Sequence, residues 1–203
     1  MKVITLCLLV LVSASCLLSV NANAAGPNAV GFEDFDLDEF EAQLDDEYMD
    51  FETFGFIRSV RKALKKALKT VRGVNCIIKE VNEILSASTG YVDAIDACGT
   101  AVPKDVLAIV NSCKTIISLC NDVINANTKL CGTSEDGTKT TSKKCFWNLF
   151  KTVMKLTRKI NTTLKQMASL PSDTSSCFVD ATNSVKTSYN NFLPNIDTCV
   201  DSM

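Results

Sequence analysis

The residues with the clearest chemical potential in this chain are its cysteines. Cys7 and Cys16 lie near the start, and eight more are spread over the remaining sequence: Cys76, Cys98, Cys113, Cys120, Cys131, Cys145, Cys177 and Cys199. In an oxidising compartment, an even and well-spaced set of this kind predicts a disulfide framework. Four bridges would form if all eight cysteines paired within the chain, and the spacing leaves their connectivity open.

The absence of histidine limits the chemistry that this chain can carry out. Without His the chain lacks the commonest general base, the Ser-His and Cys-His nucleophile pairs and the usual ligands of catalytic zinc. The cysteines form no CxxC pair, and no glycine-rich phosphate loop occurs. Eleven of the 23 Asp and Glu residues are crowded into one segment, which does not suggest a glycosidase pair. We therefore expect no metal site, no cofactor and no enzymatic activity.

The first 24 residues have the pattern of a secretory signal peptide. Lys2 precedes an apolar stretch at residues 3–20, and the small residues that follow suit signal peptidase, with cleavage expected after Ala24. A membrane anchor is the alternative, because about eighteen apolar residues can cross a bilayer. The small residues at the end of the stretch and the lack of a flanking basic stop favour cleavage, which would remove Cys7 and Cys16. We expect a secreted, extracellular protein that is not transmembrane, with no later segment apolar enough to span a bilayer.

Two blocks of opposite charge follow the signal peptide, although the formal net charge is only -2. Residues 33–52 contain eleven Asp or Glu and no Lys or Arg. The next block has seven basic residues and no acidic one: Arg58, Arg61, Lys62, Lys65, Lys66, Lys69 and Arg72. Apolar residues at spacings of three and four predict an amphipathic helix in each block, with a turn at Gly55 that folds them into a hairpin. The expected domains are a signal peptide at 1–24, an acidic Phe-rich segment at 25–55 and a disulfide-stapled helical domain at 56–203.

Three interpretations of the charged blocks remain open. In the first, both are surface helices whose charged faces are solvated and whose apolar faces join the core. In the second, the acidic segment is a pro-segment that masks the cationic helix until proteolysis, and Arg58 to Arg61 form a minimal R-x-x-R pattern. In the third, the cationic helix lies on anionic lipid with its apolar row among the acyl chains. The seven basic residues are therefore candidate anionic-surface-binding residues.

The remaining sequence predicts an all-α fold, a disulfide-linked bundle of about five to six amphipathic helices. Apolar residues recur at helical spacing, and Gly, Pro and polar clusters separate the helical stretches. The expected elements are a helix running from the basic block to residue 85, turns at Thr89 to Gly90 and at 99–103, a helix at 103–131, a polar loop at 132–144 and a helix at 146–170.

Several residues in these later elements carry separate expectations. Cys113 and Cys120 lie one heptad apart on the same face of one expected helix, so each should bridge to another helix. A direct bridge between Cys131 and Cys145, across the polar loop, is one candidate pairing. Asn161 begins the standard N-glycosylation sequon, which would be available in the secretory pathway.

Equal cysteine spacing suggests an internal duplication. Cys177 and Cys199 are separated by the same 22 positions as Cys76 and Cys98. Aligning the two pairs matches Asn82 with Asn183, Ile95 with Ile196 and Asp96 with Asp197, and places Tyr91 opposite Phe192. Each unit would be a helix, a turn at 88–91 or 190–194 and a short returning segment, stapled within itself or to its twin.

The last segment resembles a known family. Cys177, Phe178, Tyr189 and Cys199 have a spacing similar to the Cys, aromatic, Cys pattern of the TsetseEP-type secreted proteins of insects. The similarity is confined to residues 177–199 and carries over no site residues. It implies an extracellular protein of an insect.

These features favour a secreted, non-enzymatic binding protein, a carrier of lipid or another hydrophobic small molecule. Its support is a hydrophobic composition of 46%, ample for a core and a pocket. The alternative is a host-defence or signalling precursor whose acidic segment masks a cationic amphipathic helix that binds an anionic membrane surface. Nucleic acid is a poor partner, because the basic block is confined to one helix without interleaved aromatic residues.

Overall fold

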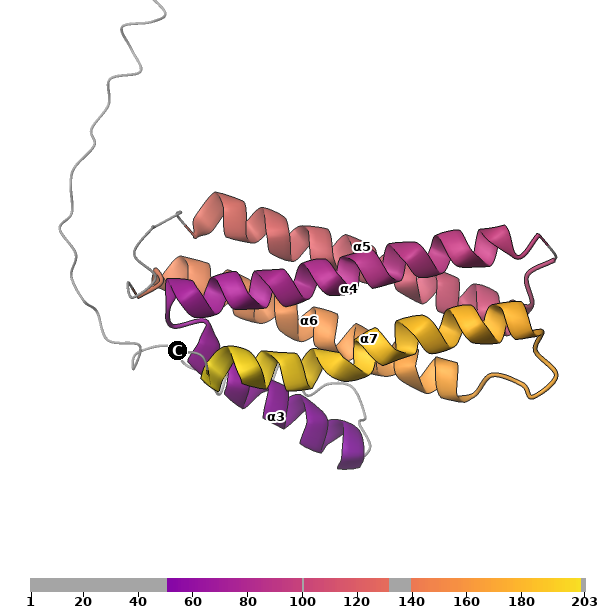
Figure 1. Cartoon of the computed structure of the whole chain (residues 1–203). Helices are drawn as coiled ribbons and strands as arrows, with labels where there is room; N and C mark the ends of the chain where they lie inside the picture. The colour runs from indigo at the N-terminus through magenta and orange to yellow at the C-terminus, as the bar shows by residue number, and fades with distance from the viewer. Residues whose placement is uncertain (1–50, 100, 132–139, 202–203) are drawn as a thin grey trace, which may run out of the picture. The chain divides into compact units, whose positions relative to one another are not determined.

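A computed structural model describes residues 51–99, 101–131 and 140–201 of the chain. These residues form an all-α bundle with three disulfides (Figure 1), which confirms the predicted fold class. The signal peptide, the acidic segment up to residue 50 and most of the polar loop lie outside the described residues. The helices, in chain order, are α3 (Phe51–Ala67), α4 (Val71–Ala97), α5 (Lys104–Leu130), α6 (Lys143–Ala168) and α7 (Ser176–Asp201).

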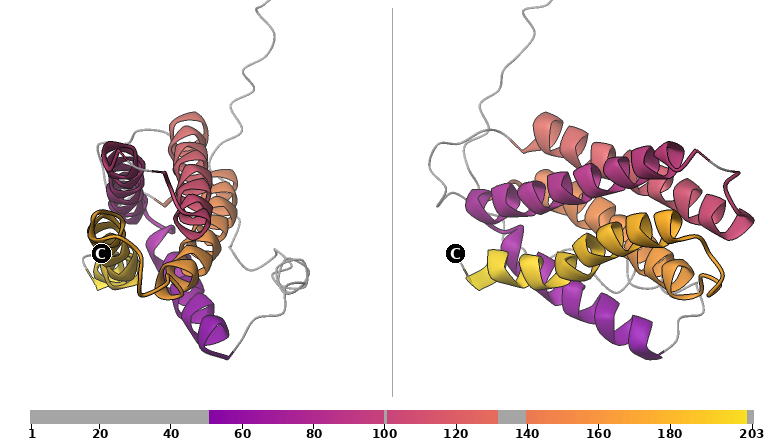
Figure 2. Two further views of the ribbon diagram at one scale, coloured as in Figure 1. Left: turned by 90° about the vertical axis from the view of Figure 1, so that its right-hand side faces the viewer. Right: turned by 45° about the vertical axis from the view of Figure 1, so that its right-hand side comes forward.

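Four long helices pack in the order α6, α5, α4, α7, and the shorter α3 packs against both α6 and α7 (Figure 2). Each helix buries the apolar row that its sequence repeats every three or four residues. Val60 and Leu64 of α3 are fully buried, as are Leu149, Phe150 and Val153 of α6. The hydrophobic core is therefore continuous between α3 and the four long helices.

The basic stretch forms two helices rather than the single long helix that its periodicity predicted. The chain turns between α3 and α4, where the Thr70 side chain caps α4 by accepting a hydrogen bond from Gly73 N at 3.1 Å. The end of α3 is held by Thr141, whose backbone N donates to Lys69 O at 3.0 Å and whose Oγ1 donates to Leu68 O at 2.6 Å. These bonds satisfy carbonyls that a helix end leaves unpaired. The expected turn at Gly55 is also wrong, because Gly55 lies within α3.

The expected turns at 88–91 and 190–194 are wrong as well, because α4 and α7 run through them. Packing outweighs local propensity here, although Gly90 within α4 costs about 1 kcal/mol and Pro194 within α7 about 3 kcal/mol. Ser88 is fully buried, and its Oγ donates to Ile84 O at 2.7 Å and lies 2.8 Å from Tyr189 Oη. The expected turn after α4 is confirmed, and Gly99 adopts a positive φ of 64° there, which favours glycine.

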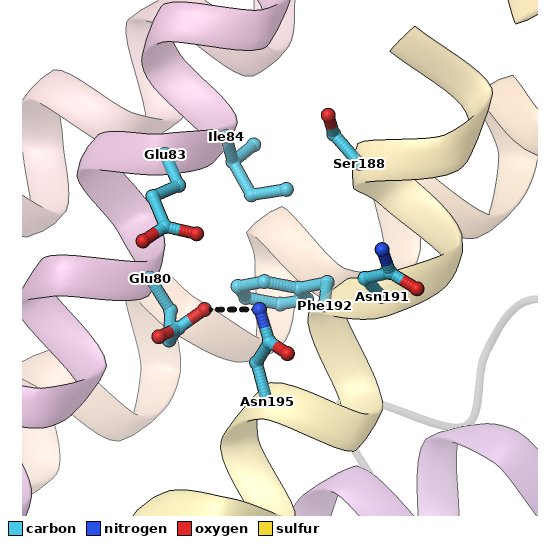
Figure 3. A pocket seen from close by; sticks show the side chains of 7 residues that line it. All are labelled: Glu80, Glu83, Ile84, Ser188, Asn191, Phe192 and Asn195. Carbon is cyan, nitrogen blue, oxygen red and sulfur yellow. Dashed lines mark hydrogen bonds between the residues drawn. The ribbon is translucent and has the colours of Figure 1, made fainter. Parts of the chain in front are cut away.

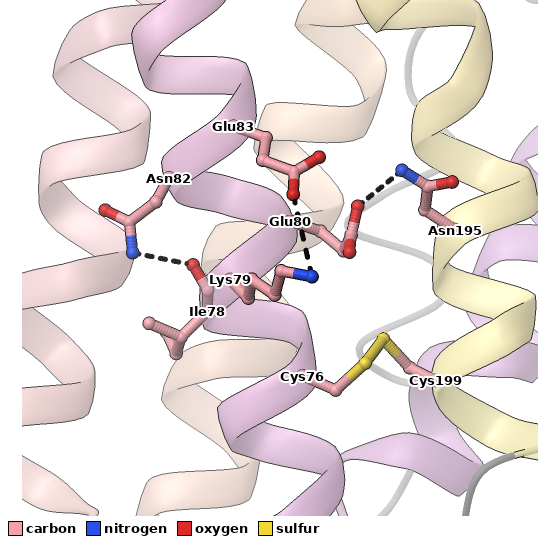
Figure 4. Close-up of polar contacts among 8 residues, drawn as sticks. All are labelled: Cys76, Ile78, Lys79, Glu80, Asn82, Glu83, Asn195 and Cys199. Atoms are coloured by element: carbon pink, nitrogen blue, oxygen red, sulfur yellow. Dashed lines mark hydrogen bonds and ion pairs between the residues drawn. A yellow bond between two sulfur atoms is a disulfide. The ribbon is translucent and has the colours of Figure 1, made fainter.

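Two disulfides staple α4 to α7 near both ends. Cys76 bonds Cys199 (Figure 4), and Cys98 bonds Cys177, so the two helices run antiparallel. The two equally spaced cysteine pairs are thus joined to each other and not within themselves. Positions matched by the alignment share their environment: Ile95 and Ile196 are both buried, and Asp96 and Asp197 are both exposed. The third disulfide joins Cys131 to Cys145, which confirms the bridge across the polar loop.

Cys113 and Cys120 are free thiols, which corrects the expectation of four bridges. Both are fully buried on α5, facing the core. They cannot bridge each other, because seven residues of helix separate their Cα atoms by about 10 Å and a disulfide needs less than about 7 Å. Tyr189 Oη lies 3.4 Å from Cys113 Sγ, so this thiol takes part in a buried polar contact between α5 and α7.

We predict that, in the chain without residues 1–24, thiol-specific reagents label no cysteine in the folded state and two cysteines after unfolding without reductant. Burial raises the pKa of Cys113 to about 11 and that of Cys120 to about 12, so neither thiol provides a reactive thiolate at neutral pH. Intact-mass spectrometry before and after denaturation counts the labels. Zero labels after denaturation would mean that a fourth disulfide exists.

The same thiols predict a fall in stability at alkaline pH. An unfolded thiol has its ordinary pKa of 9.0, and the folded state holds its proton more tightly. This contribution is complete below pH 9 and is lost as pH rises through the folded pKa values of about 11 and about 12. Denaturant titration of the parent and a Cys113→Ala, Cys120→Ala variant at pH 8 and pH 10 measures it. An equal fall in both proteins would exclude the thiols as the cause.

Among the described residues, α5 is long and apolar enough, by length and composition alone, to cross a membrane. The expectation that no later segment has such a composition is therefore wrong. Val106, Ile109 and Ile116 of α5 are fully buried, while Leu107 is 47% exposed. Because α5 packs between α4 and α6, its apolar composition has the pattern of a core helix in a bundle.

Candidate functional site

The basic residues of α3 lie on the side of the helix that faces away from the core. Arg58, Lys62, Lys66 and the following Lys69 are exposed and recur every three or four residues, while Arg61 and Lys65 are half-buried. Arg72, at the start of α4, is also exposed. The opposite row of α3 is core. This confirms the interpretation of the basic block as a surface helix, and it leaves no apolar row to enter a lipid bilayer.

The R-x-x-R pattern lies within the same helix. Arg58 is exposed, but Val60 is fully buried against the core. Cleavage after Arg61 would require α3 to unwind, because a protease binds its substrate as an extended chain. The fold therefore gives no support to processing at this position.

A second set of basic residues, on α6, was missed by the sequence analysis. The 26 residues of α6 include seven Lys or Arg and no Asp or Glu. Five of them are exposed and two, Arg158 and Lys159, are half-buried. The lack of any carboxylate over seven helical turns was the signal that could have revealed this surface. The five exposed residues are Lys143, Lys144, Lys151, Lys155 and Lys165.

Neighbouring positions of α3 and α6 concentrate positive charge on one part of the bundle. The two helices together contain twelve Lys or Arg and one Asp or Glu, a net charge of +11. Helices α4, α5 and α7 contain six Lys or Arg and nine Asp or Glu, a net charge of -3. We use the term basic face for the exposed basic residues of the two helices: Arg58, Lys62, Lys66, Lys143, Lys144, Lys151, Lys155 and Lys165.

Local contacts hold the two helices of the basic face beside each other. Thr140 pairs with Thr70 as an isolated bridge, next to the bonds from Thr141 to the end of α3. Ser142 then caps α6 by accepting a hydrogen bond from Cys145 N at 3.2 Å. Cys145 is itself fixed by its disulfide to Cys131. These contacts join the end of α3 to the start of α6, and they hold together the two helices that carry the basic side chains.

A small polar pocket lies between α4 and α7 (Figure 3), with Phe192 and Ile84 among its lining residues. Its volume is about 100 Å³, and Glu80 accepts a hydrogen bond from Asn195 Nδ2 at 2.6 Å within it. Glu83 pairs with Lys79 at 3.9 Å (Figure 4). Sites for drug-sized ligands typically measure about 300–1,000 Å³, so this pocket is too small for a lipid chain. The hydrophobic-carrier hypothesis gains nothing from it and stays a prediction.

No family model, curated protein or solved structure matches the chain. The resemblance to TsetseEP-type proteins, and the insect origin that it implies, therefore stay predictions.

The nucleophilic groups of the described core have the environment of structural residues. Burial raises the pKa of Tyr189 and of Tyr91, so both phenols stay protonated, and Tyr91 accepts a hydrogen bond from Thr182 Oγ1 at 3.5 Å. The described residues include no group of three or more His, Cys, Asp or Glu that could hold a metal ion. Asn161, the predicted glycosylation site, lies half-buried on α6. The basic face remains the strongest candidate for a binding site.

Proposed function

We propose that this protein is a secreted, non-enzymatic binding protein whose basic face binds anionic lipid surfaces. The observation that carries this proposal is the partition of charge, with twelve basic residues and one acidic residue on the neighbouring helices α3 and α6. Each Lys or Arg near an anionic leaflet contributes about 1 kcal/mol to binding. Several such residues held on one rigid surface give strong attraction to a lipid surface without a specific pocket.

The proposed binding is electrostatic and peripheral. The apolar rows of α3 and α6 are occupied in the core, so they contribute nothing to insertion. A surface held only by exposed charges is screened by salt, because the Debye length falls from about 10 Å at 0.1 M to about 3 Å at 1 M. Anionic lipid fits this face better than nucleic acid does, because the aromatic cluster of α6 is buried and offers no platform for stacking bases (Phe146, Trp147 and Phe150).

The compartment in which the protein is expected favours a lipid surface outside the cell. Three disulfides indicate an oxidising compartment. Together with the signal-peptide pattern of the first 24 residues, this favours secretion. The lipid surface would then belong to the outside of a cell, a vesicle or a lipid particle.

Vesicle sedimentation tests the proposal. The chain without the expected signal peptide, residues 25–203, should sediment with vesicles of phosphatidylcholine and phosphatidylserine at low salt, and vesicles of phosphatidylcholine alone should leave it in the supernatant. Added salt should release it. Equal binding to both vesicle types would show an apolar mode of attachment, and binding to neither would refute the proposal.

A further inference from the structure

We infer that the acidic segment of the same chain, residues 33–50, binds back onto the basic face and competes there with anionic lipid. Docking of the segment is argued from charge and chain length, and its regulatory consequence rests on the proposed function. The segment contains ten Asp or Glu and no Lys or Arg. From Thr53 to the end, the chain contains 20 Lys or Arg and 12 Asp or Glu, a net charge of +8.

The uneven distribution of that positive charge selects the docking surface. Helices α3 and α6 carry a net charge of +11, whereas α4, α5 and α7 together carry -3. A strongly acidic segment is therefore attracted to the basic face and repelled on balance by the rest of the bundle. Phe35, Phe40 and Tyr48 within the segment add apolar groups that can contact the aliphatic stems of the exposed lysines.

Connectivity makes this encounter intramolecular. The segment leads into α3 at Phe51, the first residue of a helix that carries part of the basic face. Its 18 residues can extend to about 60 Å, which exceeds the length of α6, about 40 Å. A tether of this length gives an effective concentration in the millimolar range. Weak contacts at each charge are then sufficient for the segment to occupy the face.

Occupation of the face would reduce its affinity for lipid without any proteolysis. If the segment covers the face about nine-tenths of the time, apparent lipid affinity falls about tenfold. An anionic surface of high charge density would displace the segment. Competition with the segment therefore makes lipid binding selective for strongly charged surfaces. Because α3 holds its R-x-x-R pattern in a packed helix, reversible displacement explains release better than cleavage does.

Carbodiimide cross-linking of the full chain tests the docking itself. The reagent joins carboxylates to neighbouring amines, and mass spectrometry locates the bonds. We expect links from residues 33–50 to Lys144, Lys151 and Lys155 of α6, decreasing as salt is added. Links to α3 are less informative, because the two segments adjoin in sequence. The control amines are Lys104 and Lys114 of α5 and Lys186 of α7. Equal linkage to α6 and to these controls would overturn the inference.

A second arm separates this inference from the proposed function. A variant of residues 25–203 with every Asp and Glu of residues 33–50 changed to Asn or Gln should bind vesicles of phosphatidylcholine and phosphatidylserine about tenfold more tightly than the parent chain of the same length. Selective α6 linkage without vesicle binding by either protein would retain the docking and refute the lipid function. Vesicle binding of equal strength by both proteins, with no selective linkage, would refute the docking and retain the lipid function.

Discussion

Replacing Lys62, Lys66, Lys144 and Lys155 with glutamine is expected to weaken binding to phosphatidylserine-containing vesicles by about three orders of magnitude. The four side chains are exposed, two on α3 and two on α6. At about 1 kcal/mol per basic residue near an anionic leaflet, their loss removes about 4 kcal/mol of binding free energy. Each 1.4 kcal/mol corresponds to about a tenfold change in the dissociation constant. Vesicle titration at low salt measures the change.

A matched variant separates the position of the charges from their number. Lys79 lies on α4, Lys104 and Lys114 lie on α5 and Lys186 lies on α7, outside the basic face. Changing these four residues to glutamine alters the net charge by the same amount. We expect a much smaller effect on vesicle binding, because these four residues do not belong to the basic face. Similar losses in the two variants would show that net charge, rather than the basic face, determines binding.

Removing the disulfide between Cys76 and Cys199 is expected to lower the free energy of unfolding by about 4 kcal/mol. The bond spans 123 residues, but the Cys98 to Cys177 bond already closes part of that span. The additional loop comprises the 22-position separations on α4 and on α7, about 44 residues in all, and the chain-entropy relation gives about 4 kcal/mol for a loop of this size. Domains of ordinary stability have only about 5–15 kcal/mol in total.

Chemical denaturation of a Cys76→Ala, Cys199→Ala variant measures this loss. The comparison variant is Cys131→Ala with Cys145→Ala, whose bond spans 14 residues and should contribute about 3 kcal/mol. A loss below about 1 kcal/mol for the first variant would mean that packing alone holds α7 against α4. Circular dichroism of each variant before denaturation checks that the helices remain.

Periodicity was a reliable guide to the helices whose apolar rows are unambiguous. The stripe through Phe146, Leu149 and Val153 identified α6, and the cysteines that bracket the polar loop identified its bridge. Equal spacing of the cysteines on α4 and α7 also suggested two related units, and one of the two pairings it left open, between the units, is the one found. In these cases the information is local or repeats within the sequence, so no knowledge of the packing was needed.

Tertiary contacts decided the features that the sequence analysis missed. Gly90 and Pro194 suggested turns, but burial of Tyr91 and Phe192 between α4 and α7 keeps both helices continuous. Cys113 was expected to form a bridge, although its partner in the core is the hydroxyl of Tyr189. The basic face was predicted incompletely for the same reason. Helices α3 and α6 are far apart in sequence, so their basic residues come onto neighbouring helices only when the chain folds.

Lysine footprinting on vesicles tests the central claim most directly. The chain without residues 1–24 is treated with an amine-acylating reagent, alone and bound to vesicles of phosphatidylcholine and phosphatidylserine, and mass spectrometry reports the reaction at each lysine. The account predicts that vesicles protect Lys62, Lys66, Lys144 and Lys155, while Lys104 and Lys114 of α5 react as they do in solution. Protection of the α5 lysines instead, or the same protection at every lysine, would contradict a basic face formed by α3 and α6.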